Sequence, residues 1–130
     1  MNKLIKSILF LSLPLLMLGC QKETFQLNQE FTLDFNKAAF IHIEGEEYEI
    51  KFIRLVEESR CPPDVVCVWQ GQVAVKISLD KNTEITLGLH EEIPASAVYK
   101  NHIIQLLEVN FDKKKNYGKE NHYSIRLKVE

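Results

Sequence analysis

The chain contains 130 residues, 45% of them hydrophobic, so it is long enough and apolar enough to bury the core of one domain. Its 16 basic and 18 acidic side chains leave a formal net charge of −2 at pH 7. This balance gives no reason to invoke nucleic acid, which needs a basic face on its protein partner, and we expect no nucleic-acid partner.

The chain begins with the pattern of a secretory signal peptide. Lys3 and Lys6 form a short basic region, and residues 8–18 are apolar except where Ser12 and Pro14 interrupt them. This apolar run is too short to span a bilayer, because a transmembrane helix needs about 20 such residues. It has the length of the apolar segment of a signal peptide, and we interpret it as one.

The next motif, Met17-Leu18-Gly19-Cys20, resembles the lipobox of bacterial lipoproteins. The resemblance implies that residues 1–19 are removed, that Cys20 is diacylated and that the new amino terminus is acylated. Each buried methylene of an acyl chain contributes about 0.8 kcal/mol, so Cys20 would hold the chain on a lipid bilayer. The alternative is an ordinary secreted protein with a chance cysteine at the cleavage point.

Processing at this site would leave 111 residues with 14 basic and 18 acidic side chains, a formal net charge of −4. The expected location is the bacterial cell envelope. In lipoproteins of Gram-negative bacteria an aspartate after the lipidated cysteine usually means inner-membrane retention. Gln21 occupies that position here, so the resemblance favours the outer membrane. A Gram-positive origin would place the protein on the outer leaflet of the single membrane.

The mature chain is expected to have a polar tether over residues 20–29 and one domain over residues 30–130. Within the domain, apolar and polar residues alternate with period two, which is typical of half-buried strands. The alternation shifts phase after Phe52 and after Leu106, which indicates a bulge or a strand that crosses between sheets. The predicted strands cover residues 31–35, 39–43, 48–55, 73–79, 85–89, 104–111 and 123–129.

Short turns and loops separate these strands, and no segment has the pattern of a long helix. Residues 36–37, 44–46 and 81–82 read as turns. Residues 90–98, which include Pro94, and the charged residues 112–121 read as longer loops. About seven short strands with frequent turns predict an all-β fold, either a single antiparallel β-sandwich or a partly open barrel.

Two of the three cysteines lie close together in the centre of the chain. If Cys20 carries lipid, Cys61 and Cys67 remain as a pair in an oxidising compartment, where a disulfide is expected. Zinc is a poor alternative, because a structural zinc site needs four ligands and only two thiolates are available. We therefore expect neither a metal site nor a cofactor.

The segment around these cysteines is the most distinctive part of the sequence. Pro62 and Pro63 restrict its backbone, Asp64 suits a turn, and Gly71 permits a bend into the next strand. Trp69 could cover the disulfide or close one end of the fold. Alternatively, a rigid loop could present side chains to a partner. The candidate binding residues are then Arg60, Asp64, Trp69 and Gln70.

This segment also carries a family resemblance. Ser59-Arg60-Cys61-Pro62, then Val66-Cys67 and Trp69-Gln70-Gly71, resembles a signature of small bacterial lipoproteins and secreted proteins with no assigned activity. Asp-Ser-Arg-Cys-Pro and Trp-Ala-Gly are the usual forms, whereas this chain has Glu58 and Gln70. It also has Asp64 where glycine is expected. The resemblance implies an envelope protein and no particular chemistry.

The remaining residues give no indication of catalysis. Ser59 and Ser96 lack a nucleophile-elbow motif, and the four histidines are scattered. A basic stretch at residues 113–115, with Lys119, could contact anionic head groups or glycans, or could simply be solvated. The sequence thus predicts a membrane-anchored, non-catalytic binding or structural module, whose partner could be an envelope protein or a glycan.

Two other functions fit the same residues. One is an inhibitor that inserts the Trp69 loop into the cleft of an envelope hydrolase. The other is a thiol–disulfide redox protein that uses Cys61 and Cys67. Five residues separate these cysteines, instead of the two found in the usual oxidoreductase motif.

Overall fold

The computed structural model describes residue 19 and residues 21–130. Two short 3₁₀ turns, η1 (Lys114–Asn116) and η2 (Glu120–His122), accompany the strands. The strands are β1 (Thr24–Gln26), β2 (Glu30–Asp34), β3 (Ala38–Ile43), β4 (Glu46–Glu58), β5 (Val73–Leu79), β6 (Thr83–Gly88), β7 (Ser96–Tyr99), β8 (His102–Phe111) and β9 (Tyr123–Val129).

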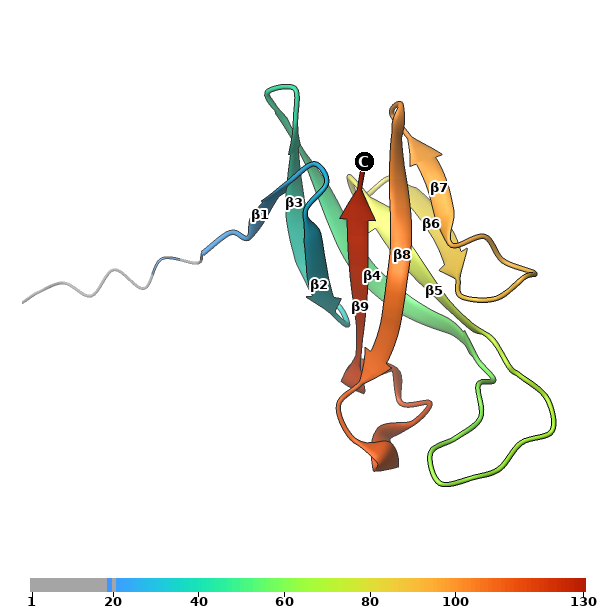
Figure 1. Ribbon diagram of the computed structural model, residues 1–130. Helices are drawn as coiled ribbons and strands as arrows, with labels where there is room; N and C mark the ends of the chain where they lie inside the picture. The colour runs from blue at the N-terminus through green and yellow to red at the C-terminus, as the bar shows by residue number, and fades with distance from the viewer. Residues whose placement is uncertain (1–18, 20) are drawn as a thin grey trace, which may run out of the picture.

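These strands form two sheets that pack face to face (Figure 1). The first sheet has the order β1-β3-β4-β5-β6, and the second has the order β2-β9-β8-β7. Neighbouring strands are antiparallel, except that β1 runs parallel to β3. The two sheets do not close into a barrel. The all-β prediction is confirmed, and the fold is a β-sandwich.

The alternation of the strands builds the core between the sheets. On β9 the four apolar residues point inward and are buried, while Ser124, Arg126 and Lys128 between them are partly exposed. Phe52 on β4 and Leu33 on β2 reach the same core from opposite sheets. The buried cluster and the residues packed against it lie between residues 25 and 129, so residues 21–130 contain the whole folding unit.

Tight turns set the register and connect the sheets. Asn36 has a φ of 63° at the turn between β2 and β3, which belong to different sheets. Its N–H donates to the Phe52 carbonyl, and the N–H of Phe35 donates to the Tyr123 carbonyl. One turn is therefore hydrogen-bonded to both sheets. It fixes this corner of the sandwich.

The structure contains two strands that the alternation pattern does not predict. β1 lies inside the expected tether, which is therefore shorter than residues 20–29. Phe40 N–H donates to the Glu23 carbonyl beside β1, and the ring of Phe25 stacks on Phe31 at 4.8 Å between centroids. β7 begins inside the loop expected at residues 90–98 and ends one residue after it. Its pattern is obscured because Val98 points outward and is exposed.

The phase shifts in the sequence are bulges. β4 changes register against β5 between Phe52 and Arg54 and again between Leu55 and Glu57. β8 does so against β9 between Leu106 and Glu108. A bulge reverses which face an alternating residue occupies and increases local twist. The bulges in β4 precede Glu58, where the central segment leaves the sheet.

Residues 1–18 and Cys20 lie outside the described part of the chain, and so do the expected signal peptide and the lipidation of Cys20. Both stay predictions. Within residues 21–130, no helix is long and apolar enough to cross a membrane.

Candidate functional site

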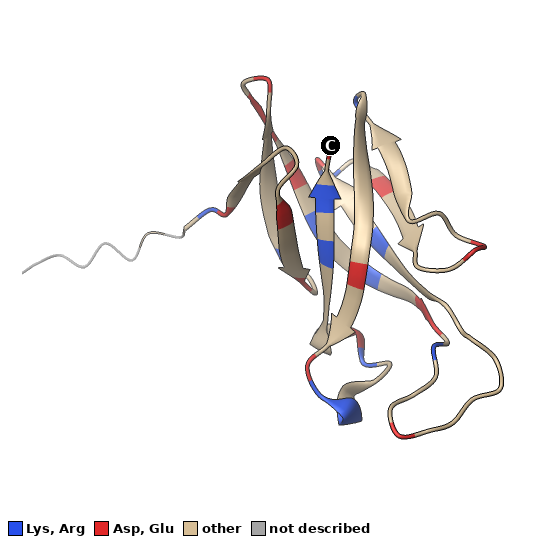
Figure 2. Cartoon of the chain, viewed as in Figure 1, with Lys and Arg blue, Asp and Glu red and all other residues tan. Residues whose placement is uncertain are grey.

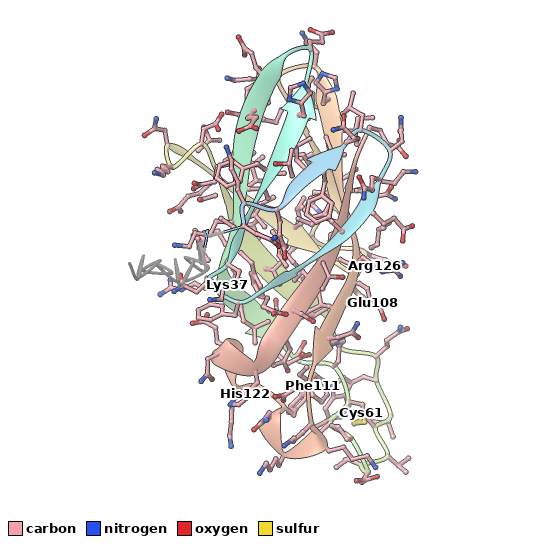
Figure 3. The ribbon with its side chains drawn as sticks, turned by 90° about the vertical axis from the view of Figure 1, so that its left-hand side faces the viewer. Lys37, Cys61, Glu108, Phe111, His122 and Arg126 are labelled. Atoms are coloured by element: carbon pink, nitrogen blue, oxygen red, sulfur yellow. A yellow bond between two sulfur atoms is a disulfide. The ribbon has the colours of Figure 1, made fainter. Side chains whose placement is uncertain are left out.

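The candidate site is the loop between β4 and β5, residues 59–72, here called the disulfide loop. It projects from one end of the sandwich beside the loop that connects β8 and β9 (Figure 1). Figure 3 shows Cys61 and Phe111 at this end, with Arg126 and Glu108 farther along the second sheet. The loop is described below from its neck to its tip.

Ser59 and Gln72 close the neck of the loop. Ser59 N–H donates to the Gln72 carbonyl at 2.9 Å, and Gln72 N–H donates to the Ser59 hydroxyl oxygen at 3.0 Å. The Ser59 hydroxyl donates back to the Gln72 carbonyl at 3.2 Å. A Cβ on Gly71 would lie 1.6 Å from the Ser59 carbonyl oxygen, so only glycine fits there. The serine and glycine of the signature thus have a structural role.

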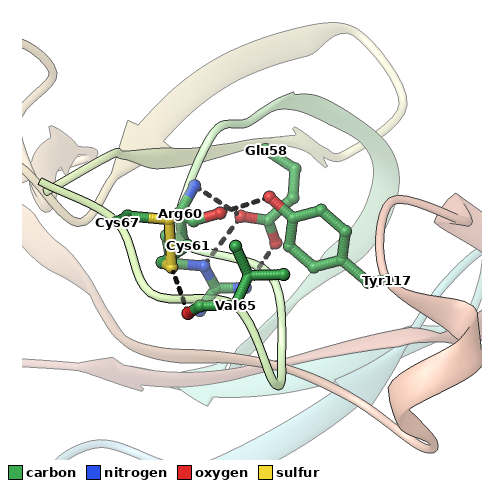
Figure 4. Close-up of a disulfide and its surroundings, with 6 residues drawn as sticks. All are labelled: Glu58, Arg60, Cys61, Val65, Cys67 and Tyr117. Atoms are coloured by element: carbon green, nitrogen blue, oxygen red, sulfur yellow. Dashed lines mark hydrogen bonds and ion pairs between the residues drawn. A yellow bond between two sulfur atoms is a disulfide. The ribbon is translucent and has the colours of Figure 1, made fainter. Parts of the chain in front are cut away.

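A disulfide joins Cys61 and Cys67, with 5.8 Å between their Cα atoms, which confirms the expected pairing. The Cys61 sulfur lies 2.9 Å from the Val65 carbonyl oxygen (Figure 4). Val65 N–H donates to the Pro62 carbonyl at 3.3 Å, and Asp64 has a φ of 64°. This is the pattern of a turn with proline at its second and a positive φ at its third position.

The turn explains how Asp64 can stand where the signature has glycine. Glycine adopts a positive φ without strain, and aspartate tolerates it better than most residues. Asp64 therefore takes the conformation for which the glycine of the signature is best suited.

The base of the disulfide loop is an ion pair between Arg60 and Glu58. Arg60 Nε and Nη2 donate to the two Glu58 carboxylate oxygens at 2.9 and 2.5 Å (Figure 4). Only 4% of the Glu58 side chain is exposed, and the Tyr123 hydroxyl donates to it at 2.8 Å. Arg60 Nη1 donates to the Val109 carbonyl at 2.9 Å. Arg60 therefore supports the loop and is not free to meet a partner.

The loop between β8 and β9 is joined to this base. The Tyr117 hydroxyl donates to the Arg60 carbonyl, and Gly118 N–H donates to the Tyr123 hydroxyl at 2.8 Å. Burial, followed by the hydrogen bond to Glu58, raises the pKa of Tyr123 to about 12. The Glu58 hydrogen bond also raises the pKa of Arg60. Near neutral pH the Tyr123 phenol therefore stays a hydrogen-bond donor and the Arg60 guanidinium stays charged, so both keep their contacts with Glu58.

The tip of the disulfide loop is apolar and exposed. Val66 is 98% exposed, Val68 is 93% exposed and Trp69 is 69% exposed, and Val65 is also largely in solvent. Of the two alternatives for Trp69, a buried cover for the disulfide or the end of the sandwich does not fit a side chain with this exposure. Arg60 and Tyr117 occupy the base instead. The alternative, a rigid loop that presents Trp69, matches this geometry.

The other candidate residues differ from Trp69 in their surroundings. Gln70 is exposed beside it. Asp64 accepts from Lys114 Nζ at 3.1 Å, but both side chains are more than 70% exposed, so this pair contributes little to stability. A shallow groove of about 500 Å³ runs beside the loop. It is lined by Arg60, Cys61, Cys67, Val68, Trp69, Gln70, Gly71 and Leu89.

Sequence reasoning missed the parts that Glu58, Tyr117 and Tyr123 play. The sequence did single out Glu58, since the signature that this segment resembles has an acidic residue directly before Ser-Arg-Cys-Pro. The inward position of Tyr123 followed from alternation, but its contact with Glu58 joins positions 65 residues apart. No short-range pattern predicts such a contact.

We expect the fluorescence of Trp69 to report an exposed indole. It is the only tryptophan, so the emission of residues 21–130 should match that of free tryptophan in water. Acrylamide should quench it almost as efficiently. Trp69→Ala should change the free energy of unfolding by no more than about 0.5 kcal/mol, because the side chain packs against little. Blue-shifted, protected emission would contradict the exposed tip.

No family model, curated protein or solved structure matches the chain. Within the described residues, no three histidine, cysteine, aspartate or glutamate side chains are grouped as a metal ion would require.

Proposed function

We propose that the protein is a lipid-anchored lipoprotein of the bacterial envelope, with the outer membrane favoured, and that its β-sandwich is a non-catalytic binding module. The binding element is the disulfide loop. The observation that carries the proposal is the contrast between a fixed base and a solvent-exposed apolar tip. Exposed apolar clusters of this kind mark interaction sites more often than inert surface.

The rigid base supports a binding role on energetic grounds. Ordering a flexible loop on binding costs free energy that is subtracted from the affinity. Here the disulfide, the neck hydrogen bonds between Ser59 and Gln72 and the Arg60–Glu58 pair restrict the loop beforehand. A large aromatic side chain on a restricted loop is a common anchor of binding interfaces. Trp69 has this position.

The first strand of the domain and the tip of the disulfide loop lie at different places on the molecule. Three residues separate Cys20 from the start of β1, so the lipid would be within about 14 Å of that strand. The chain enters at the β1 side of the sandwich, and the disulfide loop projects from the end at which β4 and β8 terminate (Figure 1). This arrangement leaves the tip accessible while the protein is anchored.

The test uses the full chain expressed in a bacterial cell. Cys20→Ser should move the protein from the membrane fraction to the soluble fraction. A photo-crosslinking amino acid at position 66 should give a discrete adduct on illumination, whether protein or lipid. The matched control is the same amino acid at position 81, an exposed lysine in the turn between β5 and β6. Equal adducts at both positions, or none, would contradict a binding role for the loop.

A further inference from the structure

The tip of the disulfide loop lies beside a group of lysines. We name residues 113–119, between β8 and β9, the lysine loop. Lys114 Nζ lies 3.1 Å from a carboxylate oxygen of Asp64, and the Tyr117 hydroxyl bonds to the Arg60 carbonyl, so the two loops are in contact. Figure 2 shows the basic residues of the lysine loop at the same end of the sandwich as the disulfide loop. The two loops therefore form one surface.

This surface has a small excess of basic over acidic side chains, because its four lysines lie beside Asp64, Asp112 and Glu120, while Glu58 is paired with Arg60. Lys113, Lys114, Lys115 and Lys119 are all exposed. Within residues 21–130, Lys114 is the only one of these four with an ion-pair partner, and that partner is the exposed Asp64. An anion facing this end would meet several free ammonium groups.

The neighbouring acids are already engaged by other groups. Asp112 accepts hydrogen bonds from Asn116 Nδ2 at 2.7 Å and lies 3.0 Å from His122 Nδ1. Glu120 accepts the N–H of Leu55 at 2.8 Å, where a bulge interrupts the β4 ladder. Glu58 is buried against Arg60. These carboxylates have contacts within the fold, and none of the three forms an ion pair with a lysine of the lysine loop in residues 21–130.

An apolar tip with basic flanks is complementary to the surface of a bilayer that contains anionic lipid. Transfer of the Val66 and Val68 side chains from water into an apolar medium is favourable. Tryptophan prefers the boundary between hydrocarbon and head groups. Lysines close to a surface of anionic lipids contribute a favourable interaction at the same depth. Since the tip of the disulfide loop projects outward, a deformable lipid surface can surround it, and the partner needs no preformed pocket.

We propose that the disulfide loop inserts its tip into an anionic lipid bilayer while the lysine loop contacts the phosphate head groups. The proposal rests on the proposed function, because it names the partner of the same loop. It gives the protein a second membrane contact, separate from the acyl chains on Cys20. The bilayer recognised is one with anionic phospholipid on the face that the loop meets.

The test measures binding of unlipidated residues 21–130 to vesicles by sedimentation and by Trp69 emission. Vesicles of phosphatidylcholine with about a third phosphatidylglycerol should bind the domain and shift the emission to the blue. Val66→Asp should lower the partition coefficient by about tenfold or more, because a carboxylate would enter the apolar layer. The matched control is Val98→Asp on β7, another exposed valine, which should bind as wild type does. Circular dichroism verifies that each variant is folded.

The lysine loop is tested separately. Each lysine near an anionic surface should contribute about a fivefold increase in partitioning. The triple variant Lys113→Gln, Lys115→Gln and Lys119→Gln should therefore bind far more weakly, and pure phosphatidylcholine should bind wild type poorly. Lysine-dependent binding that is unaffected by Val66→Asp would mean surface adsorption without insertion and would overturn the proposal. So would the absence of binding to vesicles of phosphatidylglycerol alone at low salt.

The crosslinking experiment separates the two proposals. A protein adduct at position 66 without vesicle binding would refute lipid insertion and leave the binding loop supported. No adduct and no vesicle binding would refute both. A lipid adduct at position 66, together with vesicle binding that is sensitive to Val66→Asp, would support both.

Discussion

Arg60→Ala is expected to lower the free energy of unfolding by about 3 kcal/mol. The substitution would leave the Glu58 carboxylate buried, with 4% of its side chain exposed and its charge uncompensated. The value is at the lower end for breaking a buried pair, because the Arg60 side chain is itself 31% exposed. Chemical denaturation of residues 21–130 measures the loss. The melting temperature should fall by roughly 12 °C or more.

Two controls show whether the stranded charge is the cause. Arg126→Ala removes an exposed arginine that pairs with Glu30 and Glu108, and it should cost less than about 1 kcal/mol. In a Glu58→Gln background, Arg60→Ala should cost much less than in the wild type, since no buried charge remains. Additive losses in the double variant would contradict this account.

Gly71→Ala is expected to be about as damaging, for a steric reason. The new Cβ would overlap the Ser59 carbonyl, which belongs to the backbone and cannot turn aside. The neck would have to open, and the three hydrogen bonds between Ser59 and Gln72 contribute about 1 kcal/mol each. We therefore expect a loss of about 3 kcal/mol in unfolding free energy, together with a more mobile loop.

The control for this substitution is Gly118→Ala. Gly118 has a φ of 76°, but a Cβ there would meet nothing within 4 Å, so its cost should be only the backbone strain of about 1 kcal/mol. Gln70→Ala, next to Gly71 but exposed, should be close to neutral. A Gly71→Ala variant as stable as Gln70→Ala would mean that the neck is not closed as described.

The fold was predictable wherever burial on one face controls the sequence. β9 alternates in sequence and burial over seven residues, and the larger apolar residues of β5 alternate in sequence, although Ala74 and Ser78 on its other face are also buried. β1 and β7 escaped prediction because both are short strands at sheet edges. Only one side of an edge strand is hydrogen-bonded, and few of its side chains are buried, so tertiary pairing decides its conformation.

The site was predictable in its chemistry and not in its orientation. The disulfide was predictable because Cys61 and Cys67 are the two cysteines left once Cys20 is assigned to lipid, and an oxidising compartment favours their pairing. The exposure of Trp69 depended on what else fills the base, and Tyr117 and Tyr123 contact Arg60 and Glu58 across 57 and 65 residues of sequence. The lysine loop was visible as a charge run, but its contact with Asp64 is equally long-range.

The separation of base and tip also affects how the protein can change over time. The residues that keep the loop in place, Ser59, Arg60 and Gly71, are distinct from Val66 and Val68, which are almost completely solvated. Substitutions at these tip valines would therefore alter what the loop recognises at little cost in folding free energy. The sandwich can tolerate different tip sequences, and a laboratory could vary Val66, Val68 and Trp69 around a retained Cys67 without redesigning the core.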